Sequence, residues 1–141
     1  MCEECGAPGN QCQELFNDCL AMEFENALYG KVHNLTVSTF MLQHSSRLTR
    51  EGWLYERGLL HEFLVDDKQP QQVRKERKQE VDSSKRTFKI KSRTGQPVIP
   101  SIRWAKTIMD VRLENPEHYC SDVTVWASAT LQDAERIILA G

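Results

Sequence analysis

The stretch that decides the fold is residues 11–46, QCQELFNDCLAMEFENALYGKVHNLTVSTFMLQHSS. Its first part carries apolar residues at helical spacing and ends in Gly30, where a helix C-terminus favours glycine. In its second part, which is also expected to be a helix, Val37, Met41 and His44 lie along one face. Because only a short turn near Gly30 separates the two parts, we expect an antiparallel helical hairpin.

The remaining chain predicts further helices around this hairpin, and therefore a mainly α, compact multi-helix domain. A Cys-rich, zinc-knuckle-like loop precedes the hairpin, and alternating polar and apolar residues indicate a short extended segment near 86–92. The further helices are expected at 48–67 with Thr49 as N-cap, at 70–84, at 101–114 with Ser101 as cap, and at 115–140 with Pro116 near the first position.

The whole chain, 1–141, is expected to be a single domain, since 141 residues with 40% hydrophobic content can build one core. Trp53, Trp104 and Trp126 each fall in an apolar stripe and are predicted to lie in that core. Within the domain we distinguish a metal loop (1–12), a helical core (13–65), a basic and partly irregular segment (66–100) and C-terminal helices (101–141).

The composition also predicts where the protein works. No apolar run approaches the roughly 18 residues of a membrane helix, and the N-terminus lacks the pattern of a signal peptide. We therefore expect a cytoplasmic protein with no membrane partner and with reduced thiols. An odd number of cysteines, five, also argues against a disulfide framework.

Charge is distributed unevenly along the chain. Residues 68–93 hold ten basic and three acidic residues, whereas residues 1–67 hold four basic and eleven acidic ones. The acidic half and the basic stretch can attract each other within the fold or across a dimer, or the basic stretch can contact an anionic partner such as nucleic acid. The candidate anion-binding residues are Arg74, Lys75, Arg77, Lys78, Lys85 and Arg86.

The loop MCEECGAPGNQC (1–12) is the strongest functional signal in the sequence. A Cys-x-x-Cys step places Cys2 and Cys5 on one tight turn, as zinc sites require, and Gly6 lets the backbone bend there. Cys12 follows at the start of a helix, where the dipole favours a thiolate. We therefore expect zinc as the cofactor, with a redox dithiol as the alternative use of these cysteines.

The fourth ligand is expected to be a histidine. Cys19 lies two helical turns from Cys12, roughly 10 Å away, which is too far for one ion. His33 and His44 stand about 16 Å apart on their helix, so only one of them can join the site. In the expected hairpin His44 lies beside Cys12, and we predict the set Cys2, Cys5, Cys12 and His44, with His33 as the second choice.

A second polar group is expected at the turn of the hairpin, where Glu23, Glu25, Tyr29 and His33 can converge. A carboxylate beside an imidazole serves as a general base or as part of a second metal site. The simpler interpretation, which we favour, is a buried polar network that fixes the hairpin.

The segments CEECG, AMEFENALYGKVHNLTVSTFMLQHS, RTFKI and W…TIMDV resemble a family of small uncharacterised bacterial proteins, classed as a domain of unknown function. The resemblance covers nearly the whole chain. Cys19 matches no cysteine of that family, and Asn34 stands where many members carry a second histidine. The resemblance implies no activity, but it marks as motif positions Cys2, Cys5, Cys12, Glu23, Tyr29, His33, Leu42, Gln43 and His44.

These observations predict a small zinc-binding helical protein, and they favour a non-catalytic interaction or regulatory protein over an enzyme. Its expected partner is another protein, with a homodimer as one form. Two alternatives stay open at this point. One is a metal-dependent enzyme that uses an open zinc position or Glu23 and His33, and the other is nucleic-acid binding through residues 74–93.

Overall fold

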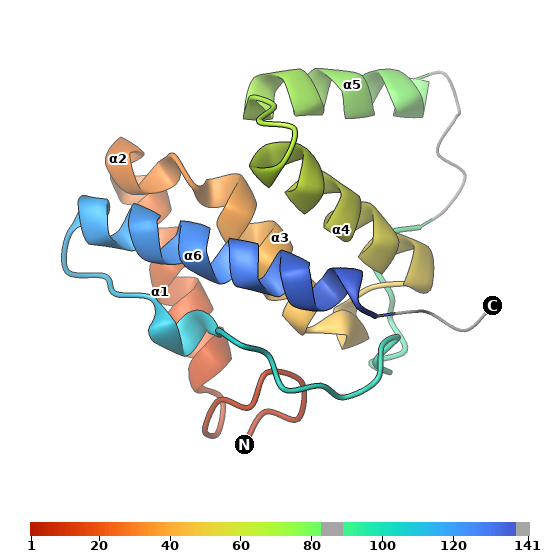
Figure 1. The fold of residues 1–141 in the computed structure, drawn as a ribbon, viewed down its shortest axis with the longest axis horizontal. Coiled ribbons are helices and arrows are strands. Elements are labelled where there is room, and N and C mark those ends of the chain that lie inside the picture. Colours follow the sequence, from red (N-terminus) through yellow and green to blue (C-terminus); the bar gives the residue numbers. More distant parts are fainter. Residues whose placement is uncertain (83–88, 138–141) are drawn as a thin grey trace.

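The computed structural model describes residues 1–82 and 89–137, and it confirms the predicted mainly helical class (Figure 1). Two short 3-10 helices, η1 (Ser45–Arg47) and η2 (Ile108–Asp110), lie between the α-helices. The α-helices of the described residues are α1 (Gln11–Glu25), α2 (Ala27–Gly30), α3 (His33–Gln43), α4 (Arg50–Leu64), α5 (Pro70–Asp82) and α6 (Pro116–Glu135).

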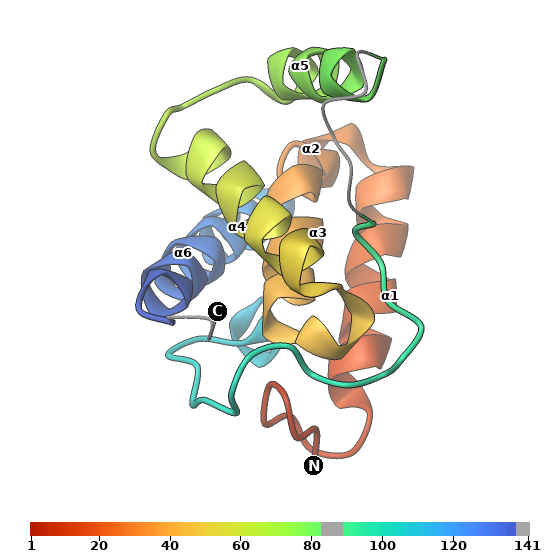
Figure 2. The same ribbon diagram turned by 90° about the vertical axis from the view of Figure 1, so that its right-hand side faces the viewer.

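The predicted antiparallel hairpin is formed by α1 and α3, and α2 lies in the turn between them (Figure 2). The Phe16 and Phe40 rings stack with their centroids 3.9 Å apart, and both side chains are buried. The expected single helix over 11–30 is wrong in one detail, because it breaks at Asn26. That residue is extended, and its side chain caps α2 by accepting a hydrogen bond of 2.9 Å from the Leu28 amide.

Helix α3 lies between α1 and α4, and α6 packs against both α3 and α4 (Figures 1 and 2). Thr49 caps α4 as predicted, accepting from the Gly52 amide at 2.9 Å. The fully buried Trp53 joins α4 to α3 by donating its Nε1–H to the Leu42 carbonyl at 3.0 Å. Trp126 of α6 is buried in the neighbouring part of the core.

The predicted helix over 101–114 is wrong, because this segment is irregular apart from η2. Side chains satisfy its backbone locally. Thr107 and Asp110 form a capping box around η2, and the Ala105 amide donates to the Asp133 carboxylate of α6 at 2.9 Å. Trp104 is buried as predicted, although it lies on this irregular segment and not on a helix.

The basic segment contributes α5 and a short extended stretch. Helix α5 packs on α4 through the buried Val73 and through Arg77, which lies 2.9 Å from the Glu62 carboxylate. Of the extended segment expected near 86–92, residues 86–88 lie outside the described residues. The rest pairs with the chain before α4, through a bridge between Leu48 and Lys91. Among the described residues, no helix has the length and apolar character that crossing a membrane requires.

Candidate metal centre

The structure brings together the four residues predicted as ligands. One ligand atom from each of Cys2, Cys5, Cys12 and His44 lies within 4.8 Å of the others. In a tetrahedron with ordinary zinc bond lengths these atoms stand roughly 3.3–3.8 Å apart. A contraction of about an ångström would therefore close the cluster around an ion, and the site can hold one metal.

A tight backbone turn positions the first two cysteines. The Gly6 amide donates to the Cys2 carbonyl at 2.8 Å, and the Cys2 amide donates to the Ala7 carbonyl at 2.6 Å. Gly6 has a φ of +85°, in the region that L side chains rarely adopt, which accounts for the glycine directly after Cys5. The chain then enters α1, where Cys12 is the second residue.

Backbone amides point at the sulfur atoms, as they do in metal knuckles. Burial raises the pKa of the Cys2 thiol, but the amides of Cys5 and Glu4 donate to its sulfur, and the resulting pKa lies below the ordinary value. Burial raises the pKa of Cys5 to about 12, and it also raises the pKa of Cys12. A cation bound here would reverse these two shifts, because a metal ion deprotonates the thiols that coordinate it.

His44 has the orientation of a metal ligand. It follows the last residue of α3, is 3% exposed, and donates its Nδ1–H to the Phe40 carbonyl at 2.8 Å. This bond fixes the tautomer in which Nε2 carries a lone pair, and the buried Nε2 has no hydrogen-bond partner among the described residues. Burial lowers the pKa of His44, so the ring stays neutral and able to coordinate.

Contacts of Glu4 that the sequence does not reveal hold the loop in place. Glu4, between the first two cysteines, accepts hydrogen bonds from both the amide and the hydroxyl of Ser46, each at 2.8 Å. Trp104 donates its Nε1–H to the Glu4 carbonyl at 3.0 Å. No spacing rule connects Glu4 with residues 42 and 100 positions further along the chain, so only the tertiary structure reveals these contacts.

The other two cysteines lie outside the cluster. Cys19 is 1% exposed in the core, and burial raises the pKa of its thiol to about 11. Cys120 is partly buried, and its thiol donates to the Leu28 carbonyl at 3.3 Å. His33, the second choice for the fourth ligand, is likewise absent from the Cys2–Cys5–Cys12–His44 cluster.

The buried Glu23 and the exposed His33 belong to a separate polar network. Oε2 of Glu23 accepts from the Thr36 hydroxyl at 2.6 Å and from the Tyr119 hydroxyl of α6, and Oε1 lies 2.8 Å from His33 Nδ1. Glu25 is exposed and the Tyr29 hydroxyl donates to the Leu113 carbonyl at 2.8 Å, so the expected group of four is corrected to the directly joined pair Glu23 and His33. Because both carboxylate oxygens are engaged, the arrangement agrees with a network that fixes the hairpin to α6.

The six predicted anion-binding residues differ in their surroundings: three are exposed, one is paired with acidic side chains, and two lie outside the described residues. Arg74, Lys75 and Lys78 are exposed on α5, whereas Lys85 and Arg86 lie outside the described residues. Arg77 is held by acidic side chains, Glu62 at 2.9 Å and Glu80 at 3.1 Å. Anion binding by this segment stays a prediction, and Arg77 is the member least available for it.

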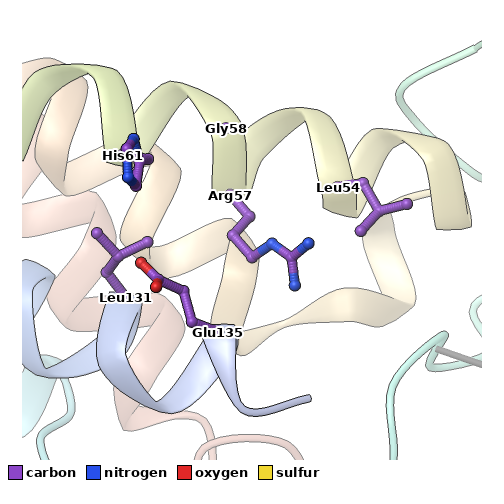
Figure 3. A pocket seen from close by; sticks show the side chains of 6 residues that line it. All are labelled: Leu54, Arg57, Gly58, His61, Leu131 and Glu135. Carbon is purple, nitrogen blue, oxygen red and sulfur yellow. The ribbon is translucent and has the colours of Figure 1, made fainter. Parts of the chain in front are cut away.

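A hollow of about 400 Å³ lies between α4 and α6, away from the metal cluster (Figure 3). Figure 3 shows Arg57 projecting from α4 and Glu135 from α6 into this space, next to His61. The Arg57 guanidinium donates to the Ala134 carbonyl at 3.4 Å and lies 5.4 Å over the Trp53 ring. The first of these contacts joins α4 to α6.

The fold and the site together define a small helical protein with a Cys3His cluster that can hold a metal ion. The chain belongs to the family of unknown function DUF5946, whose sequence model matches residues 1–135. This match agrees with the family resemblance inferred from the cysteine and hairpin motifs. Comparison with curated proteins and with solved structures gave no match.

Proposed function

We propose that Cys2, Cys5, Cys12 and His44 bind one Zn²⁺ in a closed tetrahedral site with a structural role. The observation that carries the proposal is the buried His44 ring, whose Nδ1–H is bonded to a carbonyl while Nε2 meets no partner in the described part of the chain. Zinc-binding histidines have this arrangement, since the second nitrogen is anchored by a carbonyl or carboxylate. Three thiols and one imidazole suit zinc better than the harder cations Mg²⁺ and Ca²⁺.

The expected role of the ion is to join three parts of the chain. The loop of residues 1–9, the first turn of α1 and the end of α3 each contribute to the cluster. Four protein ligands leave no open position for a substrate, which favours a structural over a catalytic ion. The short N-terminal loop has no helix of its own. A metal ion that links the loop to α1 and α3 would therefore add to the free energy of folding.

The first experiment is elemental analysis of protein purified without added metal. We expect one zinc per chain, lost in Cys12→Ser and in His44→Ala together with a lower melting temperature. Cys120→Ser and His33→Ala are the matched controls, because both residues lie outside the cluster, and both variants should retain the metal. Zinc retained in His44→Ala but lost in His33→Ala would refute the ligand set, and no zinc in any sample would refute the site.

We further propose that the protein acts as a non-catalytic interaction or regulatory protein with a protein partner. This proposal is supported by large apolar side chains on the surface, with Phe24 94%, Leu28 50% and Val125 52% exposed. Analytical ultracentrifugation over a range of concentrations tests the simplest partner, a second copy. Self-association that Phe24→Ser abolishes would support a dimer, and a concentration-independent monomer would exclude it.

A further inference from the structure

A groove of about 660 Å³ runs along the hairpin on the side where residues 90–95 cross it. Apolar side chains at i, i+4 spacing on the two helices line it: Phe16 and Leu20 from α1, Val37 and Met41 from α3. Its volume falls in the range of small-molecule sites. The metal cluster is separate, since none of its four residues lines this groove.

Cationic side chains form the rim of the same groove. Arg47, Lys91 and Arg93 line it, against a single carboxyl group, that of Glu56. Arg47 donates to the neutral Gln13 amide and lies 5.0 Å over the Phe40 ring, so neither contact neutralises its charge. The groove therefore combines a hydrocarbon floor with a net positive rim.

The fold holds these cations together. The Ser92 amide donates to the Arg47 carbonyl at 3.0 Å, and the Thr49 amide donates to the Ile90 carbonyl at 2.9 Å. These bonds, with the bridge between Leu48 and Lys91, fix the extended segment beside the end of α3. The rim is thus built by backbone pairing.

We propose that this groove binds a single-chain amphiphilic anion, with its acyl chain on the apolar floor and its carboxylate or phosphate at Arg47, Lys91 and Arg93. Burying a hydrocarbon chain is favourable in proportion to its apolar area, and the rim supplies charge-assisted donors for the head group. An amphiphile has an apolar chain and a charged head group, and the groove offers an apolar floor for the first and a charged rim for the second. A nucleic acid would need donors spread along a backbone path.

The test uses dodecanoate below its micellar concentration, added to full-length protein with methyl-labelled methionine. Met41 lines the groove, whereas Met109 is exposed on η2 and Met1 lines a different apolar pocket of about 390 Å³. We expect the Met41 methyl signal to shift with saturation while the Met109 signal stays. A shift confined to Met1 would place the ligand in the other pocket and overturn the proposal.

A charge variant tests the rim. Lys91→Gln combined with Arg93→Gln should weaken dodecanoate binding roughly tenfold, since each exposed charge contributes modestly. Dodecanol, which lacks the charge, should bind wild type and variant alike. Lys75→Gln combined with Lys78→Gln removes the same charge from exposed positions that do not line the groove, and should leave binding unchanged.

Two further outcomes decide against the proposal. Equal loss of affinity in both double variants would show a general effect of net charge and not a head-group site. The protein could bind phosphatidylglycerol vesicles while neither monomeric dodecanoate nor monomeric dodecyl phosphate shifts the Met41 signal. That result would indicate a membrane surface as the partner. Saturable binding of either monomer, with the Met41 shift, supports the groove, and their relative affinities identify the preferred head group.

Discussion

Glu4 offers the sharpest test of how the metal loop is held. Its carboxylate accepts two hydrogen bonds of 2.8 Å from Ser46, which follows His44 closely in the chain. A hydrogen bond to a charged group contributes about 1.5–3 kcal/mol when buried, and partial exposure of both residues reduces this. We therefore expect Glu4→Ala to lower the free energy of unfolding by about 1–3 kcal/mol.

Urea denaturation of the metal-loaded protein measures this loss, with Glu3→Ala as the control. Glu3 is the neighbouring residue and is exposed, so its replacement should change stability by less than about 0.5 kcal/mol. The double-mutant cycle of Glu4→Ala with Ser46→Ala isolates the hydroxyl bond. If the loop positions the ligands, zinc competition should also show roughly tenfold weaker binding in Glu4→Ala, since 1.4 kcal/mol corresponds to a factor of ten. Equal behaviour of Glu4→Ala and Glu3→Ala in both assays would refute the reasoning.

Two further predictions concern α4. Burial raises the pKa of Glu56, so its contribution to stability is present at acid pH and is lost as the pH rises through the folded-state pKa. Glu56→Gln should thus be more stable than wild type to urea at pH 7 and equal to it below the ordinary carboxyl pKa, whereas the exposed Glu51→Gln changes neither. A Cβ on Gly52 would lie 2.1 Å from the Ile90 carbonyl, so Gly52→Ala should lower the melting temperature, at a cost of about 1–3 kcal/mol. Gly58→Ala, with open space around it, should raise stability by about 0.5–1 kcal/mol, and a similar loss in both variants would contradict the packing argument.

Local sequence patterns determined the helices and the composition of the metal loop. Thr49, Asn115 and Pro116 mark helix starts through capping chemistry that acts within a few residues. The position of His44 in the predicted cluster also followed from the sequence, because a short turn between two helices forces an antiparallel register. Apolar periodicity alone, however, predicted a helix over 101–114 that the structure does not contain.

Only the tertiary structure decided what depends on contacts between distant residues. The Asp133 carboxylate accepts from the Ala105 amide, and the Glu4 carbonyl accepts from the Trp104 side chain. The first bond satisfies a backbone amide of a segment for which apolar periodicity predicts a helix. The engagement of Glu23 by Tyr119, 96 positions away, likewise leaves no trace in residue spacing. The sequence by itself thus determined which residues are able to bind a metal and where most helices begin. Long-range hydrogen bonds and packing decided how the loop is held and where the groove lies, because those energies exist only between residues that folding brings together.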